Sequence, residues 1–555
     1  MSLLSPSRSR LRDIFFIVLF VSLFSGARTL AGAQGEIQRP VETVVPSGTD
    51  KATTQASLEK AEQLYRTYQF EAAAEAFRAI IKSDEESALA YVGLVRVYLK
   101  QKKPVKANLA ALTATKLAPT LDAVRVALGE VYFRQGKMPE AETEFANLAR
   151  ANTKEPRAYL GLSRVYEASS YHKRAKLAID LAHALDPADP AIQQAWIRTV
   201  SRADQIKTLQ TYLAAQTNDD DKRRRLEEQL EILQNEVSHS VYPCHLATPL
   251  SKAEIKMAQL SDGPSLRGFG LNVKINGVSS KLLLDTGAGG LVLNRKLAET
   301  AGVKQLGETY VKGIGDKGVA TGYVGYADSI KIGALEFQDC YVRVIDRGSV
   351  LEDEGLIGTD VFSDFLVELD FPNGKLRLSE LPPRPEESAA AGAPRSGSSP
   401  EAGFKDRYVA PAMKEFTPVF RFGHLLLIQT RLNNLPGKLF LIDTGAFNNT
   451  ISPAAAREVT RVSGDADTRV KGVSGAVKNV FRAEDLTFQF GYLRQRNRDV
   501  VAFDTDGLSD SIGTEVSGTL GFAMLWLLVI KIDYRDGLVN FTYDPSQLVN
   551  PRWRQ

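Results

Sequence analysis

The sequence carries the tetrapeptide Asp-Thr-Gly-Ala twice, at 285–288 and at 443–446, in the second half of the 555-residue chain. Each copy directly follows an apolar run, at 282–284 and at 440–442. Short alternating runs with Gly and Asn turns surround both copies, and this pattern predicts β-strands. A single Asp-Thr-Gly is a weak signal that usually marks a turn, so the surroundings of the two copies decide what they mean.

The surroundings of the two motifs also repeat each other, in the same order and at similar spacing. Each Asp follows a strand and an Asn-centred turn, and about 28 residues later comes a Val-Lys-Gly segment. A short apolar element ending in Gly follows, and then an apolar strand that ends in Asp-Phe or Asp-Tyr. The matched positions are Asn276 and Asn433, 311–313 and 470–472, 356–358 and 519–521, and Asp370-Phe371 and Asp533-Tyr534. The chain therefore contains the same β-rich unit twice, at 238–381 and at 405–546.

This duplicated template resembles the pepsin/retropepsin aspartic proteases, and Asp-Thr-Gly-Ala is closer to the retroviral form of the motif. The resemblance implies an all-β, bilobal acid protease fold with a pseudo-twofold axis, and hydrolysis of peptide bonds by Asp285 and Asp443. The supporting active-site loop residues that it implies are Thr286, Gly287, Ala288, Thr444, Gly445 and Ala446. The flap candidates that it implies are Gly313, Ile314 and Gly315 in the first lobe and Gly472 and Val473 in the second.

Two adjacent carboxyl groups suit this chemistry because they cannot both ionise comfortably and so share one proton. The ionised carboxylate accepts a proton from water and the protonated carboxyl polarises the scissile carbonyl. The pair titrates as a unit, so the proton is not assigned to either residue. No cofactor and no metal are predicted, because the two cysteines and five histidines show no metal-ligand spacing.

Two alternatives remain open at this point. A protease-like fold does not guarantee turnover, so the lobes could form a peptide-binding module without catalytic activity. Each lobe could also pair with the same lobe of another chain, although the linker at 382–404, rich in Pro, Ala, Gly and Ser, makes pairing within one chain easy.

Residues 54–237 form a predicted arm of helical repeats with a period of 34 residues. Small and aromatic residues recur at this spacing: Ala73, Ala107, Ala141 and Ala175, and Tyr98, Tyr132 and Tyr166. The period resembles the tetratricopeptide repeat, in which small residues let paired helices approach each other and aromatic residues fill the gaps. The arm is predicted either to bind a protein partner on its concave face or to act as a spacer.

The N-terminal 33 residues are predicted to be a secretory signal peptide, with Arg8, Arg10 and Arg12 ahead of an apolar run at 14–24 and a small-residue cleavage site at 31–33. A disordered linker at 34–53 and a C-terminal tail at 547–555 complete the organisation. The mature protein is expected to be periplasmic or secreted, with a polypeptide substrate and no membrane span. A net charge of +3 gives no reason to expect nucleic acid as a partner. Cys244 and Cys340 form either a disulfide or two buried thiols.

Overall fold

The computed structural model describes residues 48–67, 69–215, scattered helical positions between 223 and 234, 244–262, 265–311, 320–345, 355–385, 404–472 and 475–543. The predicted signal peptide, the C-terminal tail and most of the 382–404 linker lie outside these residues. The first helix begins at Gly48, six residues before the predicted start of the arm. Helix ends are the least certain part of a sequence-based prediction, because they depend on local capping rather than on the repeat period.

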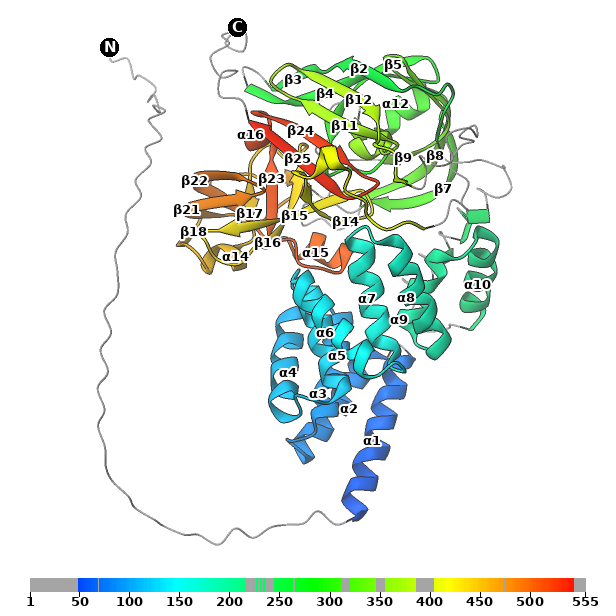
Figure 1. Ribbon diagram of the computed structural model, residues 1–555, viewed down its shortest axis with the longest axis vertical. Coiled ribbons are helices and arrows are strands. Elements are labelled where there is room, and N and C mark those ends of the chain that lie inside the picture. The colour runs from blue at the N-terminus through cyan, green and yellow to red at the C-terminus, as the bar shows by residue number, and fades with distance from the viewer. Residues whose placement is uncertain are drawn as a thin grey trace, which may run out of the picture. The chain divides into compact units, whose positions relative to one another are not determined.

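The helical arm consists of successive helical hairpins (Figure 1). Four hairpins follow one another, and each joins its two helices by a short turn. A short helix, a 3-10 turn and a longer helix come next. In chain order the helices are α1 (Gly48–Arg66), α2 (Phe70–Ser83), α3 (Ala88–Lys100), α4 (Pro104–Leu117), α5 (Asp122–Arg134), α6 (Met138–Ala151), α7 (Pro156–Ala168), α8 (His172–Leu185), α9 (Pro190–Trp196), η1 (Ile197–Thr199) and α10 (Arg202–Ala215).

The 34-residue period reflects close packing between these helices. The four period alanines are at most 3% exposed, so each lies where two helices meet. A Cβ atom added at Gly93 would lie 2.3 Å from the Phe77 ring, and one added at Gly161 would lie 2.4 Å from the Phe145 ring. These glycines therefore allow an aromatic ring from the neighbouring helix to contact the backbone, as the repeat pattern predicts.

The first lobe is built on a large, mainly antiparallel sheet, with strand order β1-β9-β6-β10-β5-β4-β8-β7 and β3 beside β4. The Cys244–Cys340 disulfide joins the segment before β1 to β9, so the disulfide is the correct alternative of the two predicted for the cysteines. The strands are β1 (His245–Leu246), β3 (Ala258–Asp262), β4 (Ser265–Ile275), β5 (Val278–Asp285), β6 (Leu291–Asn294), β7 (Lys304–Val311), β8 (Ala320–Ile332), β9 (Leu335–Ile345) and β10 (Gly355–Gly358).

The second lobe repeats this arrangement with strand order β14-β15-β16-β23-β17-β22-β21-β18, and β19 and β20 form a separate small hairpin. The Asn turns match as well, because Asn276 and Asn433 both have positive φ, 47° and 48°. The strands are β14 (Phe420–Phe422), β15 (Leu425–Leu432), β16 (Lys438–Asp443), β17 (Thr450–Ile451), β18 (Val462–Gly464), β19 (Lys471–Gly472), β20 (Gly475–Ala476), β21 (Phe481–Phe490), β22 (Leu493–Ala502) and β23 (Gly518–Gly521).

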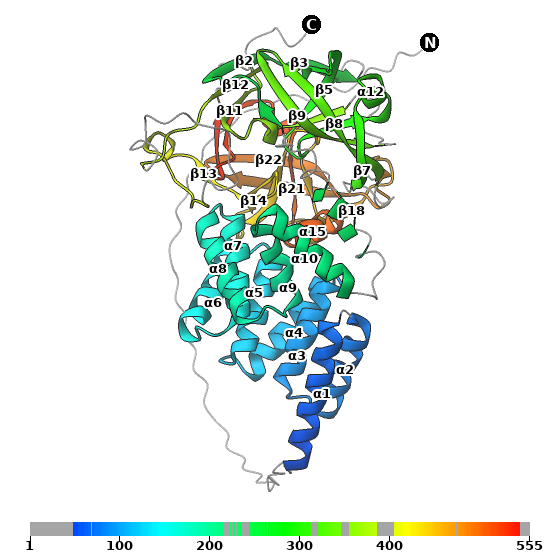
Figure 2. The same cartoon turned by 90° about the vertical axis from the view of Figure 1, so that its right-hand side faces the viewer.

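A third sheet is shared between the lobes (Figure 2). Its central pair joins β11 of the first lobe to β24 of the second, with Leu366 opposite Asp533 and Asp370 opposite Val529. The strands are β2 (Lys252–Lys256), β11 (Phe365–Asp370), β12 (Lys375–Glu380), β13 (Thr417–Pro418), β24 (Leu528–Asp533) and β25 (Leu538–Tyr543). The architecture is therefore the predicted one, a helical-repeat arm followed by a bilobal β-rich region.

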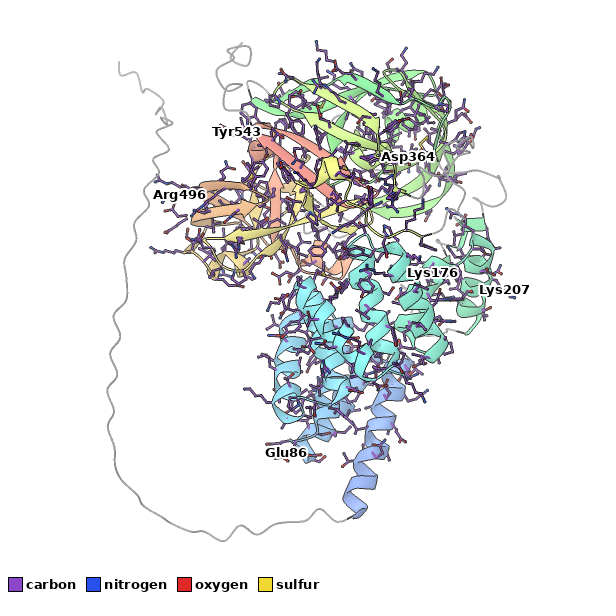
Figure 3. All side chains as sticks on the ribbon, viewed as in Figure 1. Glu86, Lys176, Lys207, Asp364, Arg496 and Tyr543 are labelled. Carbon is purple, nitrogen blue, oxygen red and sulfur yellow. A yellow bond between two sulfur atoms is a disulfide. The ribbon has the colours of Figure 1, made fainter. Side chains whose placement is uncertain are left out.

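Short helices connect the strands, and charged side chains cover the outside. The connections are α12 (Arg295–Thr300), η2 (Thr359–Phe362), η3 (Pro411–Met413), α14 (Pro453–Arg457), α15 (Asp506–Ile512) and α16 (Phe522–Leu525). Lys207 on α10 and Arg496 on β22 extend outward (Figure 3). Within the described residues, no helix combines the length and the apolar character needed to cross a membrane.

The arm docks on the second lobe. Met138, at the start of α6, is 1% exposed and packs against an apolar cluster on the outer face of β15 and β16. That cluster contains Leu425, Leu427, Leu439, Leu441 and Val516. At the end of α5 the Arg134 guanidinium donates to Asp510 Oδ1 at 2.7 Å. The main-chain carbonyl of Arg134 accepts from the Glu515 N–H at 2.8 Å. The arm therefore covers the strand that ends in Asp443.

Candidate active site

Asp285 and Asp443 are the last residues of two equivalent strands, β5 and β16. Each strand pairs in parallel with the short apolar element ending in Gly that follows it in the repeat, β10 in the first lobe and β23 in the second. The register puts Gly358 opposite Asp285 and Gly521 opposite Asp443. A Cβ atom at either glycine would lie within 2.5 Å of a backbone carbonyl oxygen of the adjacent loop. The two glycines therefore allow the loops to fold tightly over these strand ends.

The structure brings the two carboxyl groups together, although they come from different lobes. Asp285 is 8% exposed and Asp443 is 7% exposed, and their side chains are hydrogen-bonded to each other. Gly287 and Gly445 lie against the carboxyl group of the opposite lobe. An added Cβ would lie 2.9 Å from Asp443 Oδ1 at Gly287 and 2.3 Å from Asp285 Oδ2 at Gly445. Any side chain at either glycine would therefore displace the pair.

Thr286 and Thr444 tie the two loops together through four reciprocal hydrogen bonds. Each hydroxyl accepts from the backbone N–H of the other threonine, at 3.0 Å in both directions. The Thr286 hydroxyl donates to the Ile442 carbonyl at 2.7 Å, and the Thr444 hydroxyl donates to the Leu284 carbonyl at 3.0 Å. Both threonines are at most 1% exposed. Because every polar group here is paired, this network holds the two strand ends in a fixed relation.

The backbone donors to the two carboxylates differ. Asp443 Oδ1 accepts two N–H groups, from Gly445 at 3.0 Å and from Ala446 at 2.9 Å. Asp285 Oδ1 accepts the Gly287 N–H at 2.7 Å, and the Gly445 N–H also hydrogen-bonds to the Asp285 carboxyl, but the Ala288 N–H donates to the main-chain oxygen of Asp285 at 3.4 Å. Hydrogen bonds to a carboxylate favour its ionised form. The asymmetry therefore favours a negative charge on Asp443.

The pKa values follow from burial and from this asymmetry. Burial, and then the charge of the neighbouring Asp443, raise the pKa of Asp285 well above its ordinary value. Burial also raises the pKa of Asp443, but hydrogen bonds from Ala446, Asp285 and Gly445 oppose that rise. Two such groups in contact favour the state with one shared proton.

Two contacts between the lobes lie directly after β10 and β23, the strands that pair with β5 and β16. The sequence did not predict them. The Thr359 hydroxyl is hydrogen-bonded to the Tyr534 hydroxyl, and the equivalent positions Phe522 and Phe371 form an edge-to-face aromatic pair at 5.8 Å. All four side chains are at most 2% exposed. The signal was present in the paired templates, which differ at these positions. Pairing of like lobes would place Thr359 against Phe371 and leave its hydroxyl without this partner.

The two flap candidates differ in structure. In the first lobe β7 and β8 form a long hairpin, but its tip at 312–319, which contains Gly313, Ile314 and Gly315, lies outside the described residues. In the second lobe Gly472 pairs with Gly475 in the small β19–β20 hairpin, and Val473 lies outside the described residues. The first-lobe hairpin is the longer of the two described pairings.

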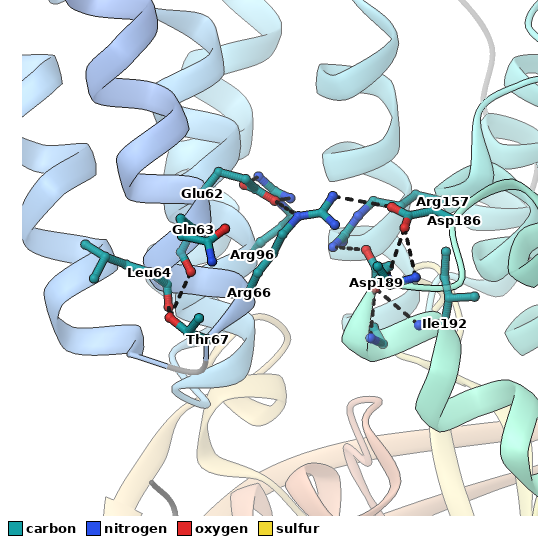
Figure 4. Close-up of polar contacts among 12 residues, drawn as sticks. Glu62, Gln63, Leu64, Arg66, Thr67, Arg96, Arg157, Asp186, Asp189 and Ile192 are labelled. Atoms are coloured by element: carbon teal, nitrogen blue, oxygen red, sulfur yellow. Dashed lines mark hydrogen bonds and ion pairs between the residues drawn. The ribbon is translucent and has the colours of Figure 1, made fainter. Parts of the chain in front are cut away.

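A second polar constellation lies in the arm (Figure 4). Tyr65 is 4% exposed and lies between two guanidinium groups, with Arg96 at 5.1 Å and Arg157 at 5.8 Å from the ring centroid. Glu62 pairs with Arg96, and Asp189 pairs with Arg157 at 2.6 Å. Helices α1, α3, α5 and α7 line a cavity of about 420 Å³ beside this network. The arm therefore contains a cavity lined by both charged and apolar side chains, as well as apolar helix contacts.

Comparisons with known proteins agree with this division. A family model described as Aspartyl protease matches residues 271–361, and one described as Tetratricopeptide repeat-like domain matches residues 28–163. No curated protein matches the sequence. The chain is thus a fusion of a tetratricopeptide repeat-like segment and an aspartyl protease-like segment, which confirms the resemblance inferred from the motifs. Asp285 lies inside the matched protease segment and Asp443 lies outside it.

Solved structures similar to the chain include one for each part. An aspartic proteinase from Irpex lacteus has 12% sequence identity and a TM-score of 0.31, and the match covers 54% of this chain and 99% of that chain. A thermophilic TPR protein from Thermus thermophilus has 21% identity and a TM-score of 0.26, and the match covers 31% of this chain and 97% of that chain.

Proposed function

We propose that the protein is an aspartic-type endopeptidase in which Asp285 and Asp443 activate one water molecule. The observation that carries the proposal is the pair of buried carboxyl groups, hydrogen-bonded to each other and fixed by the Thr286–Thr444 network. Such a pair, with one shared proton, supplies a general base and a general acid at the same point. The substrate is a polypeptide.

The mechanism follows from the donor asymmetry. The Asp443 carboxylate takes a proton from the water, whose oxygen bonds to the scissile carbonyl carbon, while Asp285 gives its proton to the carbonyl oxygen. In the tetrahedral intermediate, Asp443 passes its proton to the amide nitrogen as the C–N bond breaks. Asp285 recovers a proton from the hydroxyl that becomes the product carbonyl. Water and the peptide bond are consumed, and the pair returns to its one-proton state.

The test is a cleavage assay with unfolded polypeptides between pH 3 and 7, with and without a statine-type inhibitor. We expect inhibitor-sensitive cleavage by the wild type and a loss of about 10³-fold or more in kcat for Asp285→Asn and for Asp443→Asn, because each removes one of the two proton-transfer roles. Asp364→Asn is the matched control, since Asp364 is exposed (Figure 3). Full activity in both single variants would exclude this mechanism.

A second candidate function is peptide or protein binding without turnover. The cavity in the arm favours an interaction role for that part of the chain, because it presents Glu59, Arg66 and Glu155 beside apolar side chains. The cleavage assay separates the two candidates. Retention of polypeptides without inhibitor-sensitive cleavage would favour the binding module.

We also propose that the protein is exported, with the signal peptide removed after residue 33, and acts in the periplasm or outside the cell. The Cys244–Cys340 disulfide supports this proposal, because such bonds persist in oxidising compartments and are rare in the cytosol. N-terminal sequencing of the mature protein and fractionation of the cells test it. A cytosolic protein with an intact N-terminus would contradict it.

The lobes pair within one chain in this proposal. The cross-lobe pairs Thr359–Tyr534 and Phe371–Phe522 support pairing of the first lobe with the second. The first pair joins two hydroxyl groups, and the second joins two aromatic rings. Mass measurement of the active species tests this point. An active species that is only dimeric would favour exchange of lobes between chains.

A further inference from the structure

The loop that follows Asp285 is held by three ionisable side chains. The Arg343 guanidinium donates to the Gly289 carbonyl at 2.9 Å, and Asp360 Oδ1 accepts the Gly290 N–H at 2.8 Å. The third is His424, which belongs to the other lobe and follows β14. Its ring packs directly on the loop, since a Cβ atom added at Gly289 would lie 2.5 Å from His424 Nδ1. The half-buried imidazole also donates to the Gly287 carbonyl.

The loop that follows Asp443 is held by neutral groups at the corresponding points. Backbone N–H groups of Phe522 and Ala523 donate to the carbonyls of Ala446 and Phe447, at 2.7 and 2.8 Å. Asn449 Oδ1 accepts the Gly521 N–H at 2.8 Å. The two loops therefore have the same sequence at 285–288 and 443–446 but different supports.

The different supports coincide with the different backbone donors. The Gly287 carbonyl and the Ala288 N–H belong to one planar peptide unit, so a contact at the carbonyl sets the direction of the N–H. In the first lobe this N–H donates to the main-chain oxygen of Asp285, whereas the equivalent Ala446 N–H donates to the carboxylate of Asp443. The Gly445 N–H hydrogen-bonds to both carboxyl groups, but the N–H three residues after the aspartate reaches the carboxylate only in the second lobe.

We propose that His424 is a positioning residue that holds the Gly287–Ala288 peptide turned away from the Asp285 carboxylate, and so assigns the acid role to Asp285 and the base role to Asp443. The proposal rests on the proposed protease function. It gives the second lobe a direct influence on the reacting group of the first, through a side chain that does not touch substrate.

A pH effect follows from the groups around the imidazole. Burial lowers the pKa of His424; Asp360 on η2 and the Gly287 carbonyl oppose this, while Arg343 on β9 and Arg421 on β14 add to it. The ring is therefore neutral at pH 7 and gains its charge under more acidic conditions. A positive imidazolium beside the Asp285 loop stabilises the singly ionised carboxyl pair. The wild type should therefore retain activity to lower pH than a variant without the histidine.

The activity test compares His424→Gln and His424→Ala with the wild type and with His183→Gln. The control removes a histidine that stacks on Trp196 in the arm at 3.9 Å. We expect His424→Gln to move the acid limb of kcat/KM up by about one pH unit, because it removes a nearby positive charge. His424→Ala should also lower kcat roughly tenfold with KM unchanged, because the peptide loses its anchor. Profiles identical to that of the wild type in both variants would overturn the proposal.

A second measurement needs no enzymatic activity. The His424 pKa is followed by NMR in the wild type and in the Asp285→Asn/Asp443→Asn variant, with the resonance assigned by its loss in His424→Gln. Coupling between two groups is reciprocal, so the pKa should fall in the neutral variant by as much as His424→Gln raises that of the carboxyl pair. An unchanged His424 pKa would overturn the proposal. An inactive wild type with the expected NMR shift would contradict only the protease function.

Discussion

At the scale of single residues, equivalent positions in the two lobes have different electrostatic surroundings. Asp370 ends β11, where its carboxylate accepts from Arg377 at 2.8 Å and from Asn373 at 3.0 Å. Asp533 ends the equivalent strand β24 and is completely buried. Its Oδ1 accepts the Asp536 N–H at 3.0 Å, and its Oδ2 has no hydrogen-bond partner among the described residues. Burial, and then the Asp536 charge, raise the pKa of Asp533 to about 6.

This raised pKa predicts a pH-dependent loss of stability. Between the unfolded pKa of about 3.9 and the folded pKa of about 6, the folded protein binds more protons than the unfolded chain. The free energy of unfolding therefore falls as pH rises through this window, by about 3 kcal/mol in total. Asp533→Asn should remove this decrease in the free energy of unfolding. The substitution should also change that free energy by an amount that does not depend on pH. Urea unfolding of both proteins at pH 4, 5, 6 and 7 measures it.

The control for this measurement is Asp364→Asn, which changes an exposed carboxyl. Its free energy of unfolding should run parallel to that of the wild type at every pH. If the free energy of unfolding of Asp533→Asn also runs parallel to that of the wild type, the pKa of Asp533 is the same in the folded and unfolded proteins and burial does not raise it.

The same contrast explains what could be predicted at this scale. Asp285 and Asp443 were predicted because the motif, the strand and the spacing are all local in sequence. The surroundings of Tyr534 and His424 depend on side chains from the other lobe. One sequence does not show which of these side chains meet. The differences between the two lobe templates were the available signal.

At the scale of elements, the active-site loops depend on the threonine network. Thr444→Val keeps the shape of the side chain but leaves the Leu284 carbonyl and the Thr286 N–H without partners. Each buried unpaired group costs about 1–3 kcal/mol, so we expect a loss of about 2–5 kcal/mol in the free energy of unfolding. Thr444→Ser keeps the hydroxyl and should cost only about 1 kcal/mol for the lost methyl group. Urea denaturation compares the two.

A double-mutant cycle with Thr286→Val checks that the bonds, and not the substitutions themselves, carry the effect. The two valines remove a shared network, so the double variant should lose clearly less than the sum of the single losses. Additive losses would mean that the two threonines act independently.

Helices and strands were predicted at this scale wherever a period was visible. The 34-residue spacing gave the helical hairpins, since Ala73 and Ala141 mark buried helix contacts directly. Alternating runs gave the strands of each lobe. The shared sheet was not predicted, because pairs such as Leu366 and Asp533 lie far apart in the chain and local pattern does not specify their register.

At the scale of the whole molecule, the docking of the arm was the largest feature that the sequence reasoning missed. A strand with one face in the core should alternate apolar and polar residues, but 425–428 and 439–442 are apolar throughout. Such runs are typical of strands covered on both faces. In the structure, Leu426 and Phe440 point to the lobe core, and Leu427 and Leu441 pack in the cluster with Met138 of the arm.

This interface makes the arm part of the stable unit that holds Asp443. Met138→Ala removes a side chain that is 1% exposed, and large-to-small changes at such positions cost about 2–5 kcal/mol. Leu439→Ala truncates its partner on β16. Because the two side chains share one cluster, the double variant should lose less than the sum of the single losses by about 1 kcal/mol or more.

The measurement is urea unfolding of the full chain. Leu109→Ala on α4 is the matched control, since Leu109 is 61% exposed and should change stability by less than about 0.5 kcal/mol. Fully additive effects of Met138→Ala and Leu439→Ala would mean that the arm and the second lobe are stabilised separately.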